Sequence, residues 1–340
     1  MRIGVVGYIG SGKSTFFEWI TRVTPDPALA HATQSAMVEV PDARVAPLCG
    51  IYHPKKTTLA SIELVDTPGL HRTHEGNAVR LAALREAGCL VVVVAAHGDQ
   101  APAADLNNFE DDLLIADLEI VSGRVERLRE SLRKPRPNRD EQRKELDALE
   151  PLRAALEAGT PLRAIQLSPD QARAIRSFQL FSEKPRMVVL NTADDESDAD
   201  RFLGLGGSSP TIAVPLRLQL DLERMEASER TAFCSEMGVQ VRDRHAVIRQ
   251  LMDASGQMLF FTAGEKEVRT WMVRKGGTAL DAAAGIHTDL ARGFIRAEVM
   301  TCDDLIGLGS EREVKARNRL RREPKDYVIQ DGDILLIQHN

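Results

Sequence analysis

Short apolar runs rich in β-branched residues alternate with helical patterns through the first two thirds of the chain. They lie at residues 3–6, 37–40, 62–65, 90–95, 187–190 and 211–214. Strands that are buried on both faces of a parallel sheet read as continuous apolar runs, and the helices between them cover those faces. The pattern therefore predicts an α/β fold with a doubly wound, mostly parallel sheet.

The region from about residue 110 to residue 182 departs from this alternation. Leucine and isoleucine recur at helical spacing in EDDLLIADLEIVSGRVERLRESLRK, the run PRPNRD interrupts the pattern, and EQRKELDALEPLRAALEAG resumes it. Two helices joined by a proline-rich turn form an antiparallel hairpin. We expect a helical, coiled-coil hairpin inserted between strands of the sheet, and a pair of ordinary surface helices is the alternative.

The pattern changes again after a helix expected at residues 245–255. From GQMLFFTAGEKEVRTWMV onwards, short strands alternate with turns, and Asp331-Gly332 is expected to form a tight turn between two strands. We therefore expect two domains: an α/β domain at residues 1–256 that contains the helical insert, and a small α+β domain at residues 257–340.

Composition and charge indicate a mixed globular protein without a membrane partner. The 340 residues are 43% hydrophobic and 28% charged, with a formal net charge of −6. The longest apolar run, at residues 89–96, is far shorter than the roughly 20 residues that span a bilayer, and no apolar leader precedes a cleavage site. We expect a cytoplasmic protein. Its four cysteines lie far apart, which gives little support to a zinc site or a disulfide scaffold.

The stretch GYIGSGKS at residues 7–14 is the first candidate for chemistry. It fits the pattern GxxxxGK[ST], follows an expected strand and opens an expected helix, as a phosphate-binding loop requires. Backbone N–H groups of such a loop converge on a phosphate. Lys13 is expected to bridge the β- and γ-phosphates, and the Ser14 hydroxyl to bind Mg²⁺. The residues expected to hold the nucleotide here are Gly10, Ser11, Gly12, Lys13, Ser14 and Thr15.

Two further motifs follow at the ends of later strands. In LVDTPGL, residues 64–70, Asp66 can reach Mg²⁺ and the N–H of Gly69 can meet the γ-phosphate, so this segment would sense that phosphate. VVLNTAD, residues 188–194, places Asn191 and Asp194 where switch NTPases recognise the base. Three motifs in this order predict a switch-type P-loop NTPase that takes a purine nucleoside triphosphate. They disfavour a metabolic kinase, which would need an acceptor site and a lid.

Five longer stretches extend the comparison to the whole chain. They are PDARVAPLCGIYHPKK, EGNAVRLAALREA, LLIADLEIVSGRVERL, FFTAGEKEVRTWMVRKGGTALDAAAGIHTDLARGFIRAEVM and KDYVIQDGDILLI. Together they resemble the YchF group of Obg-related P-loop NTPases, and the last two resemble that family's C-terminal TGS domain, a β-grasp module. The resemblance implies an ATPase or dual-specificity NTPase with a central helical arm, which associates with ribosomes.

Several positions depart from the pattern of that family. The family usually has asparagine and valine where this chain has Gly10 and Ser11, which leaves phosphate binding intact. Its base motif usually reads Asn-x-x-Glu, whereas Asp194 stands here. An aspartate accepts hydrogen bonds from guanine, but the lysine that would lie along the base is replaced by Thr192. The resemblance favours ATP over GTP, a GTP-specific GTPase remains the alternative, and the role of VPLRLQ, residues 214–219, stays open.

The residue after the DTPG glycine bears on hydrolysis. Small GTPases have a glutamine there that orients the attacking water, whereas Leu70 can form no hydrogen bond. The resemblance implies a histidine on a nearby loop, which points to His97, with His71 and His74 as competitors. Thr33, just before a strand, could complete the Mg²⁺ shell. No arginine finger is evident, so we predict slow intrinsic turnover. The catalytic candidates are Lys13, Gly69, Leu70 and His97, and the metal ligands expected are Ser14, Asp66 and Thr33.

Basic residues gather in two places despite the acidic total. The hairpin carries Arg124, Arg127, Arg129, Arg133, Lys134, Arg136, Arg139, Arg143 and Lys144, and the last domain carries Arg312, Lys315, Arg317, Arg319, Arg321, Arg322 and Lys325. Such clusters suit phosphate backbones, although interleaved glutamates also fit a solvated helix face. With the resemblance, we expect contact with RNA or the ribosome. Two functions stay open: a hydrolase that cycles on a ribosomal partner, and a nucleotide-gated binding module with vestigial hydrolysis.

Overall fold

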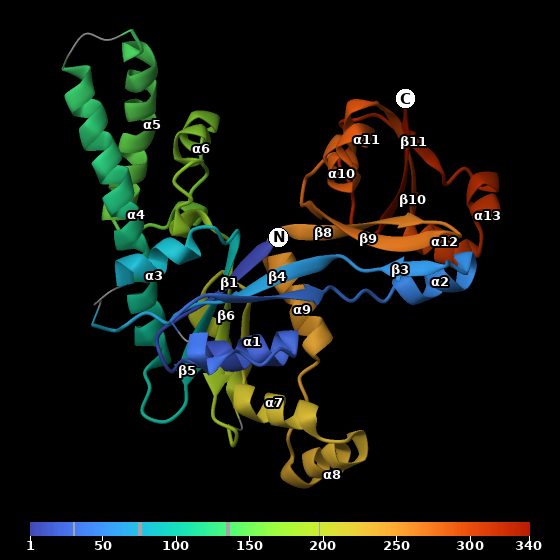
Figure 1. Ribbon diagram of the computed structural model, residues 1–340, viewed down its shortest axis with the longest axis horizontal. Coiled ribbons are helices and arrows are strands. Elements are labelled where there is room, and N and C mark those ends of the chain that lie inside the picture. The colour runs from blue at the N-terminus through green and yellow to red at the C-terminus, as the bar shows by residue number, and fades with distance from the viewer. Residues whose placement is uncertain (30, 74–76, 134–136, 197) are drawn as a thin grey trace. The chain divides into compact units, whose positions relative to one another are not determined.

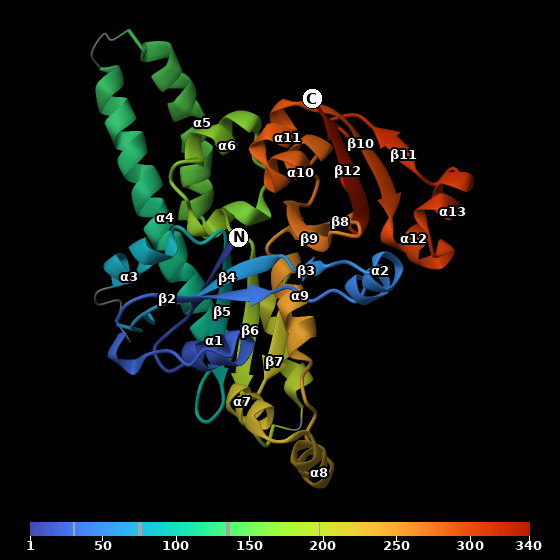
Figure 2. The same cartoon turned by 45° about the vertical axis from the view of Figure 1, so that its right-hand side comes forward.

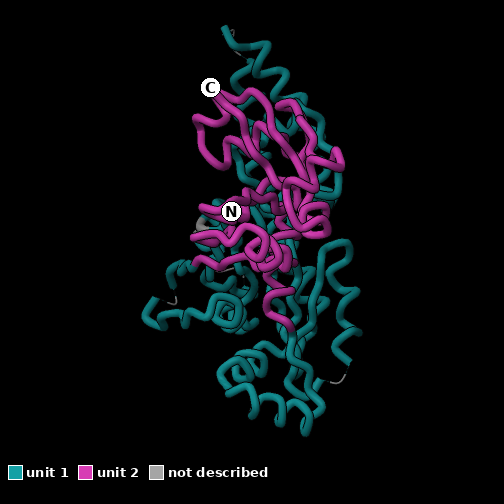
Figure 3. The backbone as a smooth tube through the Cα atoms, turned by 90° about the vertical axis from the view of Figure 1, so that its right-hand side faces the viewer, with its two compact units in different colours: residues 1–36, 63–242 teal, residues 37–62, 243–340 magenta. Residues whose placement is uncertain are grey.

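The structure, a computed structural model (Figure 1), describes residues 1–29, 31–73, 77–133, 137–196 and 198–340. The chain forms two compact units (Figure 3): unit 1 comprises residues 1–36 and 63–242, and unit 2 comprises residues 37–62 and 243–340. The C-terminal region thus forms one unit with a segment from the first quarter of the chain. The domain bounds expected at residues 1–256 and 257–340 stay predictions.

The first six-stranded sheet lies mostly in unit 1 and has the order β2-β4-β1-β5-β6-β7, with parts of β2 and β4 assigned to unit 2. Strand β1 is parallel to β4 and β5, β5 to β6, and β6 to β7. The strands are β1 (Arg2–Val6), β2 (Gln34–Glu39), β4 (Ser61–Asp66), β5 (Cys89–Ala96), β6 (Arg186–Thr192) and β7 (Thr211–Val214). Each of the six apolar runs forms a strand, so the doubly wound, mostly parallel α/β sheet is confirmed.

Unit 1 also contains helices, and some of them pack against this sheet. They are α1 (Lys13–Thr21), α3 (Asn77–Leu84), α4 (Pro102–Leu132), α5 (Arg139–Glu157), α6 (Pro169–Ile175), α7 (Leu216–Arg224) and α8 (Ala227–Met237), with 3-10 turns at Pro27–Leu29, Leu162–Ala164, Phe181–Glu183 and Ala199–Gly206. On one face, alternate residues of β5 join a core cluster with α3 and α4. Because all eight residues of β5 are buried, the opposite face of the sheet is covered as well.

The helical hairpin between β5 and β6 consists of α4 and α5, which lie side by side in Figures 1 and 2. Apolar side chains from both helices share a core, and ion pairs join their flanks: Arg124 to Glu145 at 2.7 Å and Arg129 to Glu150 at 2.8 Å. Helix α4 begins at Pro102, before the start expected from the leucine pattern, because proline at the first helical position is favourable. Lys134 and Arg136 lie outside the described residues.

Unit 2 contains a second six-stranded sheet, in the order β11-β10-β12-β8-β9-β3. Strand β8 is antiparallel to β9 and parallel to β12, and β12 is antiparallel to β10, which is the arrangement of a β-grasp fold. The elements are β3 (Lys56–Thr58), β8 (Gln257–Ala263), β9 (Glu267–Arg274), β10 (Phe294–Thr301), β11 (Arg321–Glu323), β12 (Asp333–His339), α2 (Val45–Tyr52), α9 (Arg244–Ala254), α10 (Ala279–Ile286), α11 (Thr288–Arg292), α12 (Cys302–Leu308) and α13 (Glu311–Ala316). Strand β3 extends the edge of this sheet beside β9, which the sequence did not indicate.

One local prediction in unit 2 is wrong. Asp331-Gly332 forms a turn before β12, but the residues ahead of it form no strand, apart from a single bridge at Val328. The cause is the buried Asp333 carboxylate, which accepts hydrogen bonds from the Gln330 N–H and the Tyr327 hydroxyl, both at 2.9 Å. These bonds curl the preceding backbone into an irregular segment.

Among the described residues, no helix combines the length and the hydropathy that a bilayer crossing needs.

Candidate nucleotide-binding site

The phosphate loop connects β1 to α1, and Gly12 closes it with a backbone φ of 100°. A Cβ at Gly12 would lie 2.6 Å from Asn191 Nδ2, so glycine is required by both conformation and space. Asn191 Nδ2 donates to the Ser11 carbonyl at 3.2 Å, and its Oδ1 accepts the Leu216 N–H at 3.2 Å. The base motif at the end of β6 is therefore bonded both to the phosphate loop and to the start of α7. Gly10 is exposed in the same loop.

Lys13 is the buried cation of this loop, with 7% of the residue exposed. Its Nζ donates to the Tyr8 carbonyl at 2.8 Å, and burial lowers the pKa of Lys13 to about 8. A Cβ added to Gly69 would lie 2.6 Å from that Nζ, so the DTPG glycine lies directly against the lysine. The Lys13 ammonium group thus lies beside the backbone of Gly69. An anion bound there would compensate for the water that the buried ammonium group has lost.

Ser14 and Asp66 form the second contact between these motifs. The Ser14 hydroxyl donates to Asp66 Oδ2 at 2.7 Å, while Asp66 Oδ1 is buried and has no hydrogen-bond partner among the described residues. Burial raises the pKa of Asp66. Hydroxyl and carboxylate oxygens are the ligands that Mg²⁺ prefers, and an unsatisfied buried carboxylate oxygen suits a cation. These residues therefore fit a magnesium ion. Thr15 lies half-buried beside them in the first turn of α1.

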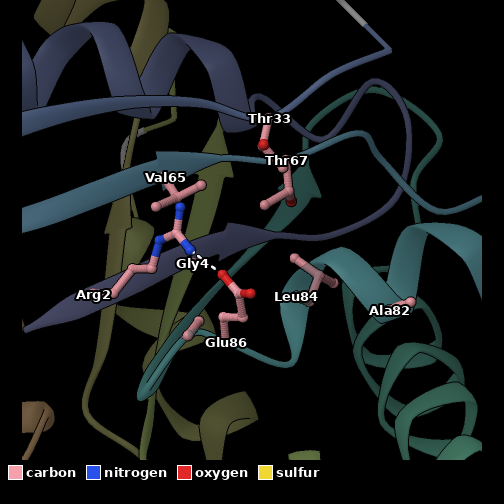
Figure 4. Close-up of a pocket in the computed structure, with 9 residues that line it drawn as sticks. Arg2, Gly4, Thr33, Val65, Thr67, Ala82, Leu84 and Glu86 are labelled. Atoms are coloured by element: carbon pink, nitrogen blue, oxygen red, sulfur yellow. Dashed lines mark hydrogen bonds and ion pairs between the residues drawn. The ribbon is translucent and has the colours of Figure 1, made fainter.

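Thr33 lies exposed at a cavity of about 230 Å³, together with Val65 and Thr67 (Figure 4). The Thr67 hydroxyl donates to the Val5 carbonyl at 2.6 Å, which holds the DTPG segment to β1. The residues described as lining the cavity come from β1, β4, the α3 region and Thr33, and none belongs to the phosphate loop. Thr33 as a magnesium ligand stays a prediction.

The hydrolysis candidates lie in different surroundings. Leu70 is 1% exposed and belongs to the core, while its N–H donates to the Gly7 carbonyl at 3.1 Å and its carbonyl accepts the Ile9 N–H at 3.0 Å. His97 is exposed immediately after β5, and His71 is half-buried, with its N–H bonded to an asparagine side chain. Within the described residues, His97 forms no hydrogen bond with the phosphate loop. His74 lies outside the described residues.

Asp194 is exposed at the other end of the site. It lines a cavity of about 510 Å³ together with Val214, Pro215 and Gln219, which belong to the segment whose role was left open. Asn191 and Asp194 thus lie in different surroundings: the side chain of Asn191 is bonded to the backbone, and Asp194 borders the cavity beside the start of α7. A role for Asp194 in base recognition stays a prediction.

Sequence reasoning missed Tyr8, the second residue of the loop motif. Its hydroxyl donates to Asp112 Oδ2 in α4 at 3.0 Å, and its ring meets Phe109 edge-on with 5.5 Å between centroids. The Arg72 guanidinium lies 5.1 Å from the same ring. No signal in the sequence marked these contacts, because the residues are far apart and belong to no motif.

A doubly wound parallel sheet with this loop, a serine–aspartate pair and a DTPG glycine against the loop lysine defines a P-loop NTPase of the switch type. Comparison with known proteins agrees. A family model described as a 50S ribosome-binding GTPase matches residues 2–121, and a model of the YchF GTPase C-terminal domain, described as a protein of unknown function, matches residues 258–340.

Relatives match over the full length. The chain is 32% identical to Obg-like ATPase 1 of Oryza sativa subsp. japonica, covering all of this chain and 92% of the relative. It is 29% identical to ribosome-binding ATPase YchF of Bacillus subtilis (strain 168), covering 99% and 98%. The solved Schizosaccharomyces pombe YchF GTPase superposes with a TM-score of 0.81 at 25% identity, covering 99% and 97%. The chain belongs to the YchF/Obg-like ATPase family.

Proposed function

We propose that the chain is a Mg²⁺-dependent nucleoside triphosphatase that favours ATP over GTP and acts as a nucleotide-dependent switch on ribosomes in the cytoplasm. The observation that carries the proposal is the meeting of Lys13, Gly69 and the Ser14–Asp66 pair where parallel strands β1 and β4 end. The names of the relatives support the nucleotide and the partner, since they describe ATPases and, in bacteria, ribosome binding.

Each residue has a definite task in this proposal. Lys13 binds the β- and γ-phosphate oxygens beside the backbone N–H groups of residues 10–15, and the Gly69 N–H meets the γ-phosphate. Ser14, Asp66 and Thr33 hold the magnesium ion, which neutralises phosphate charge when bound. Asn191 and Asp194 hold the base.

The surroundings of Leu70 support slow turnover. Its side chain is buried in the core and offers no hydrogen bond, so it does not orient a water molecule. That task falls to His97 or to a bound partner. We expect intrinsic turnover well below the roughly 10 per second that is typical of enzymes. Many turnovers per second by the purified chain would contradict this account. A His97→Ala protein that keeps the wild-type turnover in the presence of ribosomes would assign the task to the partner and not to His97.

Calorimetric titration with non-hydrolysable ATP and GTP analogues tests the nucleotide directly. We expect both to bind in the presence of Mg²⁺, the ATP analogue more tightly, and both to weaken when the metal is chelated. No uptake of either analogue would refute the proposed function. Tighter binding of the GTP analogue would replace the ATPase with the GTP-specific alternative.

Co-sedimentation with ribosomes tests the partner. If exposed basic residues of the hairpin contact phosphate backbones, binding should weaken steeply between 50 and 200 mM salt. Replacing Arg127 and Arg143 with alanine should weaken it further, while Arg176→Ala, at the end of α6, serves as the control. If ribosome binding changed neither with salt nor with the hairpin substitutions, electrostatic docking through the hairpin would be refuted.

A further inference from the structure

The phosphate loop is attached to the helical hairpin through one side chain. Tyr8, 4% exposed, leaves the loop and enters the first turns of α4, where its hydroxyl meets Asp112 and its ring meets Phe109. Phe109 is 1% and Asp112 7% exposed, so water does not replace these contacts. The loop therefore cannot shift at Tyr8 without disturbing the base of α4.

The backbone of Tyr8 is in turn held by the groups that would sense a nucleotide. Its carbonyl accepts the bond from Lys13 Nζ at 2.8 Å. The residues on either side, Gly7 and Ile9, are bonded to Leu70 of the DTPG segment at 3.1 and 3.0 Å. A triphosphate would draw the ammonium group and the Gly69 N–H toward its own oxygens, and Tyr8 lies at the centre of this set of bonds.

A second contact joins Arg72, two residues after the DTPG segment, to the same helix. Arg72 lies over the Tyr8 ring and forms a bidentate pair with Asp105, at 3.0 and 2.5 Å. Asp105, Phe109 and Asp112 are spaced by four and three residues, which places all three on one face of α4. The loop and the residue that follows closely after the DTPG segment thus both contact one stripe of the helix.

Helix α4 is suited to carry a displacement over a distance. It runs without interruption for 31 residues, which corresponds to about 46 Å, and its far part packs against α5. The stripe lies within its first three turns. A change at the stripe therefore acts at the base of the hairpin.

We propose that Tyr8 is a positioning residue that transmits nucleotide occupancy from the phosphate loop to the base of the α4–α5 hairpin. This inference rests on the proposed function, since it requires a nucleotide to bind. The coupling is reciprocal: whatever holds the hairpin also changes the affinity for the nucleotide.

Amide hydrogen exchange on the full-length chain tests the proposal. In the wild type, a saturating ATP analogue with Mg²⁺ should slow exchange of the amides at residues 105–116 by about fivefold, and in Tyr8→Phe by less than twofold. A role in stability alone would change exchange equally with and without nucleotide, so the nucleotide-dependent difference is the decisive readout. Saturation is verified for each variant by calorimetry.

Tyr327→Phe is the matched control, because it removes a tyrosine hydroxyl that donates to an aspartate in unit 2, as Tyr8 does in unit 1. It should keep the full fivefold response. Phe109→Leu provides a second variant on α4, and it should also reduce the response. Wild-type protein that binds the analogue without slower exchange in α4, or a Tyr8→Phe protein with the full response, overturns the coupling. Wild-type protein that binds no nucleotide overturns the proposed function instead.

Discussion

Each unit contains a hydrogen bond from a tyrosine hydroxyl to an aspartate carboxylate, and the two bonds differ in which parts of the chain they join. Tyr8 donates to Asp112 at 3.0 Å across 104 residues of chain, whereas Tyr327 donates to Asp333 at 2.9 Å across six. The local bond shapes the turn before β12. The long-range bond joins a phosphate loop to a helix of another part of unit 1, so its strength affects both stability and the response to a ligand.

An arginine lies over each tyrosine ring, at 5.1 Å for Arg72 and 5.2 Å for Arg321. Burial is the main cause that raises the pKa of both tyrosines, followed by the neighbouring aspartate. Tyr8 is buried, with 4% of the residue exposed, while Tyr327 is only half-buried. The similarity of the two clusters makes each a control for the other.

We expect the largest effect of a substitution at Lys13, whose Nζ donates to the Tyr8 carbonyl. The Tyr327 cluster has no counterpart, since no lysine in the described part of unit 2 is buried. Replacing Lys13 with methionine should weaken nucleotide binding at least about 100-fold, because charge-assisted hydrogen bonds are lost. The same change should stabilise unit 1 at pH 7 by about 2 kcal/mol, because a buried ammonium is costly. Calorimetry and urea unfolding measure the two effects.

The pH dependence gives the sign of this stability effect. The pKa of Lys13 is about 8 in the folded chain and 10.5 when unfolded, so between these values the unfolded state binds more protons. Wild-type stability should therefore rise over this window relative to Lys13→Met. The control is Lys315→Met, an exposed lysine of unit 2, which should change neither quantity measurably. A destabilised Lys13→Met protein would show that the ammonium group stabilises the empty loop.

Much of the fold and part of the site follow from local sequence patterns. Apolar runs identify the strands, and parallel strands bring their carboxyl ends to one edge, so motifs that follow them meet there. The Ser14–Asp66 bond and the contact of Gly69 with Lys13 are examples. These residues could be named in advance because each belongs to a pattern with a chemical meaning.

The remainder depends on contacts that no local pattern records. Tyr8 and Asp112 look ordinary in the sequence, and only the packing of α4 against the loop brings them together. Likewise, residues 56–58 join the sheet of unit 2 although they lie some 200 residues earlier than β9. The strand expected before Gly332 does not form, because the Gln330 N–H donates to the Asp333 carboxylate and not to a neighbouring strand.

Replacing the two aspartates with alanine separates stability from ligand response. Asp333→Ala leaves both the Tyr327 hydroxyl and the Gln330 N–H without their acceptor, so it should cost unit 2 about 2–3 kcal/mol. Asp112→Ala should cost unit 1 about 1–2 kcal/mol and should also change the affinity for the ATP analogue. Hydrogen exchange resolves the stability of each unit, and calorimetry measures affinity. If Asp333→Ala altered affinity as much as Asp112→Ala, the functional distinction between the two bonds would fail.

The smallest effects are expected from the arginines. Arg72 and Arg321 have side chains that are 46% and 43% exposed, so replacing either with glutamine should cost less than about 1 kcal/mol. Their partners differ, however: the side chain of Asp105 is 14% exposed, and that of Asp333 is not exposed at all. Without its arginine, Asp105 can gain water, whereas Asp333 cannot.

Arg321→Gln should therefore be the more destabilising of the pair, and its effect should persist in 1 M salt, because screening acts weakly on a buried carboxylate. The effect of Arg72→Gln should disappear under the same conditions. Urea unfolding at 0.1 and 1 M salt, followed by hydrogen exchange in each unit, measures both. If both variants lost the same stability at 0.1 M salt and neither lost any at 1 M salt, burial of the carboxylate would not distinguish the two clusters. Their difference would then lie entirely in which parts of the chain they join.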